Sequence, residues 1–202
     1  MTKRISIFGD SITWGKDDSD RGGWVNRLRH YFEVEEKSDI EVYNVGVSGD
    51  TTDDLLKRFT PECEARNRKD QVILFAIGIN DSLHYINQPD SPKVPLDRFQ
   101  SNLRKLIDDA KVFSDTIAFI GLTIVDESKM PRKEEKYWAN DRIKKYNEVL
   151  KNICMESNIP FLEMLDIIDI KDLPDGLHPD STGHEKMFQR IKEFILSNNI
   201  LD

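Results

Sequence analysis

The chain contains 202 residues, of which 38% are hydrophobic and 33% charged, a composition that suits one globular domain over residues 1–202 and excludes collagen-like and low-complexity chains. Acidic residues number 37 against 29 Lys and Arg, and the resulting net charge of −8 argues against general binding to nucleic acid. No apolar run approaches the roughly 18–20 residues that cross a bilayer, so integral membrane contact is not expected. Five apolar runs predict strands, in chain order at 3–8, 40–45, 71–77, 116–122 and 159–162.

Helical patterns separate these runs. Apolar residues at three- and four-residue spacing predict helices near 24–32, 55–59, 143–153 and 187–195, and the pattern is strongest over 96–113. The 55–59 segment follows Thr51-Thr52-Asp53-Asp54, a helix-start signature. Strands that alternate with helices predict right-handed βαβ units. We therefore expect an α/β fold, a three-layer αβα sandwich in which about five parallel strands have helices on both faces.

The cysteines and the N-terminus bear on the compartment. Cys63 and Cys154 both fall in helical patterns and form no CxxC motif, so we predict packing roles and neither a disulfide framework nor a zinc site. Two basic residues near the start are followed by too few apolar residues for a secretion signal. We expect a cytoplasmic protein.

Polar residues follow three of the predicted strands, at the strand ends beyond which such sheets bind their ligands. Ser11, in a tight turn after the first strand, could be a displayed nucleophile or could cap a turn. A glycine-containing turn at 44–52 could offer a backbone N–H to a developing negative charge, or could simply allow positive φ. Asn80, after the third strand, could donate from its amide or form an ordinary turn with Asp81.

His178 is the histidine best placed for chemistry. Pro179 biases it toward an extended backbone, and Asp175, three residues earlier, can hydrogen-bond its Nδ1 and leave Nε2 as a general base. His184 lies in a capping-box sequence and is expected on a helix surface. His30 is placed on the polar side of its helix and His84 in a loop. Nucleophile, base, orienting carboxylate and oxyanion donors together make up the set that acyl transfer needs.

Four blocks of the sequence resemble the SGNH (GDSL-type) hydrolases and occur in that family's order. They are Gly9-Asp10-Ser11, Gly49 within Val-Ser-Gly-Asp-Thr, Gly78-Ile79-Asn80-Asp81 and Asp175-Gly176-Leu177-His178. The resemblance implies a flavodoxin-like sheet and a lipase/acylhydrolase or esterase that needs no cofactor. It also implies a catalytic set of Ser11, Asp175 and His178, and an oxyanion hole formed by the N–H of Ser11, the N–H of Gly49 and the side chain of Asn80.

A serine esterase acting on a small-molecule ester is therefore the expected function, and two alternatives remain open. The same residues could pass the acyl group to an acceptor other than water, such as a sugar hydroxyl. The chain could also be a catalytically silent, flavodoxin-like binding module, although it contains neither GxGxxG nor GxxxxGK[ST]. Two long segments, 84–95 and 126–137, can overhang the site; neither is strongly apolar, which favours short acyl groups.

The remaining acidic residues are given structural roles. Asp10 and Asp81 flank the motif residues and are expected to accept hydrogen bonds in turns. The series Asp166, Asp169, Asp172 and Asp175 is interpreted as an acidic loop in preference to a cation site, and no metal is predicted. Trp14 could line the pocket or belong to the core. The oligomeric state is not predicted.

Overall fold

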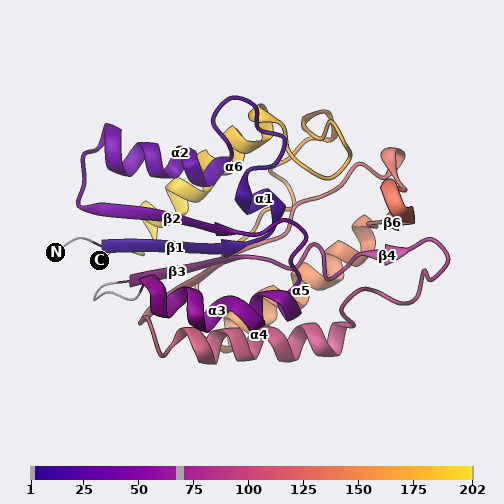
Figure 1. The fold of residues 1–202 in the computed structure, drawn as a ribbon, viewed down its shortest axis with the longest axis horizontal. Coiled ribbons are helices and arrows are strands. Elements are labelled where there is room, and N and C mark those ends of the chain that lie inside the picture. The colour runs from indigo at the N-terminus through magenta and orange to yellow at the C-terminus, as the bar shows by residue number, and fades with distance from the viewer. Residues whose placement is uncertain (1–2, 67–70, 202) are drawn as a thin grey trace.

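The computed structural model describes residues 3–66 and 71–201, and Figure 1 shows a parallel sheet flanked by helices. The sheet contains five strands in the order β2-β1-β3-β5-β7. Their bounds are β1 Lys3–Gly9, β2 Ile40–Gly46, β3 Gln71–Ala76, β5 Thr116–Ile120 and β7 Phe161–Leu162. This sheet with helices around it is the α/β arrangement that the sequence predicts.

The strand order places the first strand inside the sheet. The chain runs from β1 outward to β2 and then returns to β3 on the other side of β1, so the direction of winding reverses at β1. Ligands of such sheets bind at this reversal, outside the carboxyl ends of the strands. Gly9, the last residue of β1, pairs in register with Gly46 of β2 and with Ala76 of β3. The three turns that follow these strands consequently begin side by side.

Helices cover both faces of the sheet (Figure 1). Right-handed crossovers on either side of the reversal put the helix between β1 and β2 on one face and the next three on the other. Accordingly, α2 packs on α6, whereas α3 packs on α4 and α4 on α5. The bounds are α1 Ser11–Trp14, α2 Trp24–His30, α3 Thr52–Arg66, α4 Leu96–Ala110, α5 Asn140–Glu156 and α6 Ser181–Ser197.

Aromatic rings form the centre of the core on the α3 side. Phe8 of β1, Phe59 of α3 and Phe75 of β3 are fully buried, and their ring centroids lie 4.9 to 5.9 Å apart. Phe119 of β5 stacks on Phe75 at 4.8 Å. These contacts tie three strands to one helix. Cys63 of α3 and Cys154 of α5 are also buried and free, as the sequence predicts.

Two strands are shorter than the apolar runs suggest. β5 ends at Ile120, because the backbone N–H of Leu122 donates to Asn147 Oδ1 at 2.8 Å and leaves the ladder. β7 has two residues: Pro160 before it has no N–H, and the Glu163 carboxylate after it accepts the N–H groups of the next turn.

The two overhanging segments are paired with each other. β4 (His84–Tyr85) and β6 (Lys136–Tyr137) form a small antiparallel sheet, and the N–H of Ile86 donates to the carbonyl of Glu135 at 3.1 Å. The sequence interpretation of His84 as a loop residue is therefore wrong, because pairing with the later segment draws it into a strand. Along the described residues, no helix combines the length and apolar character needed to span a bilayer.

Candidate active site

Ser11 lies on a sharp turn directly after β1. Asp10 caps α1 by accepting the N–H of Ile12 at 2.9 Å, which fixes the first residue of that helix. Gly9 allows this close fold, since a Cβ there would lie 2.0 Å from Thr13 Oγ1 and 2.4 Å from the carbonyl oxygen of Ala76. Ser11 is consequently held at the carboxyl edge of the sheet, where it lines a cleft.

Asp175 and His178 form a compact turn before α6. Asp175 Oδ1 accepts the N–H groups of Leu177 at 2.9 Å and of His178 at 2.8 Å, and its Oδ2 lies 2.7 Å from His178 Nδ1. Burial acts to raise the pKa of Asp175, but the hydrogen bonds from the His178 ring and from the two N–H groups outweigh it and hold that pKa below its usual range. The carboxylate is thus ionised at neutral pH.

The structure brings Ser11 and His178 together across 167 positions of the chain. Ser11 Oγ lies 2.8 Å from His178 Nε2, and both side chains are buried on the floor of the cleft. With Nδ1 donating to Asp175, the neutral ring has Nε2 free to accept the hydroxyl proton. The arrangement can therefore increase the nucleophilicity of Ser11.

Gly49 and Asn80 line the same cleft. Gly49 has φ +88° and nothing within 4 Å of where a Cβ would be, so it is the backbone conformation, and not space, that requires glycine. Asn80 Nδ2 donates to the carbonyl of Asp50 at 3.0 Å. An amide nitrogen carries two protons, so a second N–H remains for another acceptor. Both residues are placed where a negatively charged oxygen beside Ser11 could be bound.

Asp10 and Asp81 accept hydrogen bonds, as predicted. Both oxygens of Asp81 lie 3.1 Å from the backbone N of Thr52, the first residue of α3, and the Thr52 hydroxyl also donates to Oδ1. Burial raises the pKa of each of these two carboxyls to about 7. Their role is to hold the turns that carry Ser11 and Asn80.

Arg132 was not identified from the sequence. It lies in the 126–137 segment, and its guanidinium contacts Asp175 Oδ2 and lies 3.3 Å from His178 Nδ1. Since Nδ1 donates to Asp175, Asp175 is the productive partner of the guanidinium. A basic residue in a charged stretch carried no signal that distinguished it from its neighbours.

The cleft has a volume of about 760 Å³ and extends from Ser11 under the paired overhanging segments. Trp138, which is 4% exposed, forms part of its wall, and Arg132 lies over the indole ring at 5.9 Å. Trp14 neither lines this cleft nor belongs to the core. It is 57% exposed and lines a separate hollow with the 15–19 turn.

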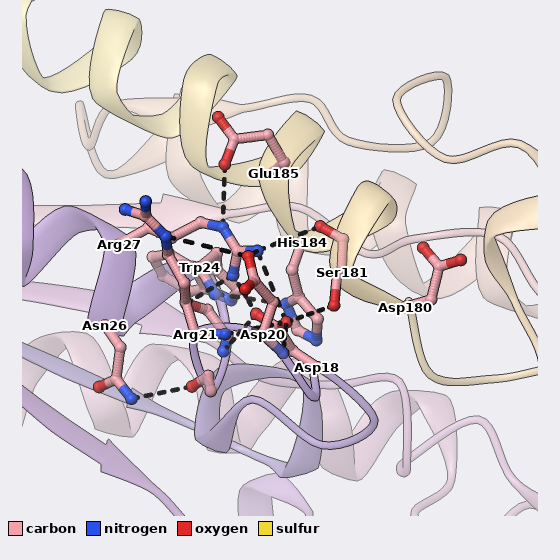
Figure 2. Close-up of polar contacts among 12 residues, drawn as sticks. Asp18, Asp20, Arg21, Trp24, Asn26, Arg27, Asp180, Ser181, His184 and Glu185 are labelled. Atoms are coloured by element: carbon pink, nitrogen blue, oxygen red, sulfur yellow. Dashed lines mark hydrogen bonds and ion pairs between the residues drawn. The ribbon is translucent and has the colours of Figure 1, made fainter.

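A buried ion pair anchors the loop between α1 and α2 beside the site. Figure 2 shows Asp18 and Arg27 next to Ser181, His184 and Glu185 of α6. Both ion-pair side chains are nearly inaccessible, and Arg27 Nε also donates to Glu185 at 2.9 Å. The Ser181 hydroxyl donates to Asp18 at 2.7 Å. These contacts hold the start of α6, which follows His178, against the loop that follows Ser11.

His184 is not on a helix surface, so that prediction is wrong. Its ring is fully buried: Nδ1 accepts the N–H of Trp24 at 3.3 Å, and Nε2 donates to the carbonyl of Lys16 at 3.1 Å. Burial lowers its pKa. The packing of α6 on α2 turns this side of the helix inward. His30 is exposed, as expected.

The acidic series pairs with basic residues. Asp166 binds Arg190, Asp169 and Asp172 both bind Lys186, and Asp175 belongs to the cleft. Among the described residues, one group has the spacing of metal ligands: Asp17, Asp175 and His178, whose ligand atoms lie within 4.8 Å of one another. The adjacent Arg132 cation opposes a metal ion there.

Comparison with known proteins gives the family. The profile of the GDSL-like lipase/acylhydrolase family matches residues 7–186, and the chain belongs to this family. A multidomain esterase of Ruminococcus flavefaciens is 25% identical over an alignment of 243 positions, gaps included. The alignment covers 92% of this chain but only 27% of that relative's length. A GDSL esterase/lipase of Arabidopsis thaliana is 24% identical over 89% of this chain and 73% of its own. An uncharacterised lipoprotein of Bacillus subtilis is 29% identical over 79% of this chain and 69% of its own.

Solved structures share the fold. A lipase/acylhydrolase from Enterococcus faecalis superposes with a TM-score of 0.77 and 24% identity, covering 97% of this chain and 96% of its own. An acetylxylan esterase from Geobacillus stearothermophilus superposes with a TM-score of 0.74 and 23% identity, covering 96% and 94%. The sheet and its surrounding helices are thus arranged as in these two solved structures.

Proposed function

We propose that this protein is a serine esterase that hydrolyses carboxylic esters with short acyl chains through an acyl-serine intermediate. The observation that carries the proposal is the pair of hydrogen bonds from Ser11 Oγ to His178 Nε2, 2.8 Å, and from His178 Nδ1 to Asp175 Oδ2, 2.7 Å. Membership of the GDSL-like lipase/acylhydrolase family supports the same chemistry.

In the acylation step, Ser11 Oγ attacks the ester carbonyl carbon while its proton passes to His178 Nε2. The carbonyl oxygen becomes an oxyanion, which the N–H groups of Ser11 and Gly49 and the side chain of Asn80 stabilise. When the tetrahedral intermediate collapses, the bond to the alcohol oxygen breaks and the alcohol leaves with the proton from Nε2. Asp175 stabilises the imidazolium while it exists.

Deacylation repeats these steps with water. His178 Nε2 takes a proton from water as the hydroxide oxygen attacks the acyl-serine carbon, and then returns that proton to Ser11 Oγ as the acid leaves. The cleft is open to solvent, so water reaches the acyl group without a conformational change.

The lining of the cleft supports short acyl groups. In the described part of the chain, its apolar or aromatic wall consists of only Leu83, Tyr85, Trp138 and Leu177. The rest of the lining is polar or charged and gives a long hydrocarbon chain little surface to cover. We expect kcat/KM to fall from acetyl and butyryl to octanoyl esters.

The test combines labelling with turnover. Wild type and Ser11→Ala are incubated with a fluorophosphonate, analysed by intact mass, and assayed on 4-nitrophenyl acetate. One adduct and rapid hydrolysis are expected for wild type, and neither for Ser11→Ala. Ser48→Ala is the matched control, because Ser48 lines the same cleft and has no assigned role; it should keep both.

Absence of an adduct and of hydrolysis in folded wild type would contradict the proposal and favour a silent binding module. Analysis of products in the presence of a sugar acceptor separates the esterase from an acyltransferase, since only the latter yields a new sugar ester.

A further inference from the structure

The charge of the cleft is opposite to that of the protein. The chain has a net charge of −8, yet in the described structure six cationic residues line the cleft and only two acidic ones, Glu134 and Asp175. A local excess of one sign in a concave site attracts ligands of the other sign. Most of the six come from the 84–95 and 126–137 segments, which overhang Ser11.

Four of these cations already have acidic partners. Lys16 lies 3.2 Å from Asp17, Lys129 lies 3.3 Å from Asp126, and Arg132 and Lys136 bind the two acidic residues of the cleft itself. Their positive charges are largely neutralised by these partners within the protein.

Two lysines remain without a carboxylate partner among the described residues. Lys133 has no ion pair, and Lys93 Nζ donates only to the carbonyl of Gly49, at 3.2 Å. Lys93 is therefore at the mouth of the cleft beside the glycine assigned to the oxyanion hole. Pairing of β4 with β6 brings the segments of both lysines to the same wall.

We infer that the preferred substrate is an ester that carries a second, negatively charged group, a carboxylate or a phosphate, which Lys93 and Lys133 bind. The inference rests on the proposed esterase function, since it places this anion on the same substrate that Ser11 attacks. Both lysines are exposed, so the charged group lies at the rim of the cleft. The reacting ester lies deeper, against the buried Ser11.

The test uses pairs of esters that differ in charge. For an anion on the alcohol part, 4-acetoxybenzoate is compared with its neutral methyl ester. For an anion on the acyl part, monophenyl adipate is compared with phenyl hexanoate. We expect kcat/KM to be higher for the anionic member of at least one pair, and that preference to shrink at 0.5 M NaCl, since salt screens exposed charges. The pair that shows the preference identifies the part of the substrate that bears the anion.

Substitution of the lysines assigns the preference to them. In Lys93→Met/Lys133→Met, the ratio of anionic to neutral kcat/KM should fall about tenfold, as two partly exposed charge pairs would predict. Lys151→Met, an exposed lysine of α5 outside the cleft, is the matched control and should leave the ratio unchanged. A wild-type ratio of one or less in both pairs, or a ratio unaffected by the double substitution, would overturn the inference.

Binding separates this inference from the proposed function. Ser11→Ala cannot turn over, and calorimetry with it should show tighter binding of the anionic member than of the neutral member in at least one of the two ester pairs. If wild type failed to hydrolyse any ester while this binding preference remained, the esterase assignment would be contradicted and the anion site would stand. If the preference were also missing, the anion site would be contradicted as well.

Discussion

At the scale of single residues, Asn80 shows how one side chain can serve both the fold and the chemistry. One N–H of its amide bonds the carbonyl of Asp50 and holds the side chain in place. The other is left for the cleft, where the oxyanion is expected. Pre-positioned donors of this kind lower the barrier because they need not reorganise when charge develops.

Replacement of Asn80 by alanine should reduce kcat on 4-nitrophenyl acetate about 10²- to 10³-fold, the usual effect of removing one oxyanion donor. KM should change little, because the bond forms mainly in the transition state. Steady-state kinetics measure both parameters, and a thermal melt checks the fold. Asn26→Ala is the control, since Asn26 bonds the carbonyl of Gly22 on an exposed part of α2. Unchanged kcat in a folded Asn80→Ala protein would exclude Asn80 from the oxyanion hole.

Asp81 should make stability depend on pH. It is fully buried, and burial raises its pKa to about 7 although Thr52 donates to it. Between pH 4 and 7 the folded protein keeps a proton that the unfolded chain has released, so the free energy of unfolding falls as pH rises through this window. Each unit of pKa difference corresponds to about 1.4 kcal/mol.

Asp81→Asn keeps an acceptor for the N–H of Thr52 and removes the charge. Urea unfolding at pH 5 and pH 8 should show that the variant gains stability relative to wild type as pH rises. Asp141→Asn, at a side chain that is 95% exposed, should show no such trend. If the free energy of unfolding of Asp81→Asn differed from that of wild type by the same amount at pH 5 and pH 8, the buried-acid interpretation would be refuted.

At the scale of elements, the Asp18–Arg27 pair fixes the loop between α1 and α2 to α2, and its bonds with Ser181 and Glu185 join both to α6 (Figure 2). Burial acts to raise the pKa of Asp18, but hydrogen bonds from Arg27, Ser181 and the N–H of Gly23 outweigh it and hold that pKa well below its usual value. The pair therefore adds stability above pH 4, and this contribution is lost as pH falls toward the folded-state pKa.

Asp18→Asn should lower the free energy of unfolding at pH 7 by about 3 kcal/mol, because it removes the buried carboxylate beside Arg27 and leaves that charge only the more exposed Glu185 and Asp20. Urea unfolding should show that the substitution lowers the free energy of unfolding less at pH 3 than at pH 7. The control is Asp109→Asn, which removes a pair with Lys105 on the surface of α4 and should cost under about 1 kcal/mol. An equal cost for the two substitutions would mean that the network does not anchor the loop.

The 126–137 segment is the element whose role the sequence described least well. The sequence predicts only that it can overhang the site. In the structure it pairs with the 84–95 segment, supplies Arg132 to Asp175 and contributes Lys133 and Lys136 to the cleft wall. The 84–95 segment and Asp175, which it contacts, lie about 40 or more positions away in the chain, and no local sequence pattern predicts such contacts.

At the scale of the whole molecule, the position of the site follows from the topology. Winding reverses at β1, and the in-register ends of β1, β2 and β3 bring the turns of Ser11, Gly49 and Asn80 to one edge. The turn with Asp175 and His178 reaches the same edge from just before α6. The protein as a whole is negatively charged, but its cleft has a positively charged wall, which suits recruitment of an anionic ester.

The sequence by itself determined the α/β class and, through the resemblance of four blocks to the SGNH hydrolases, the five residues proposed for catalysis. Both rest on local signals: apolar periodicity marks buried faces, and the short motifs that carry the resemblance stand at strand ends, which share one edge in a parallel sheet. Only the tertiary structure decided that Arg132 contacts Asp175, that His184 is buried, that Trp14 lies outside the cleft, and that Lys93 and Lys133 face one wall. Each of these depends on packing between segments far apart in the chain, where the burial and the charge of a side chain are set by its neighbours in space.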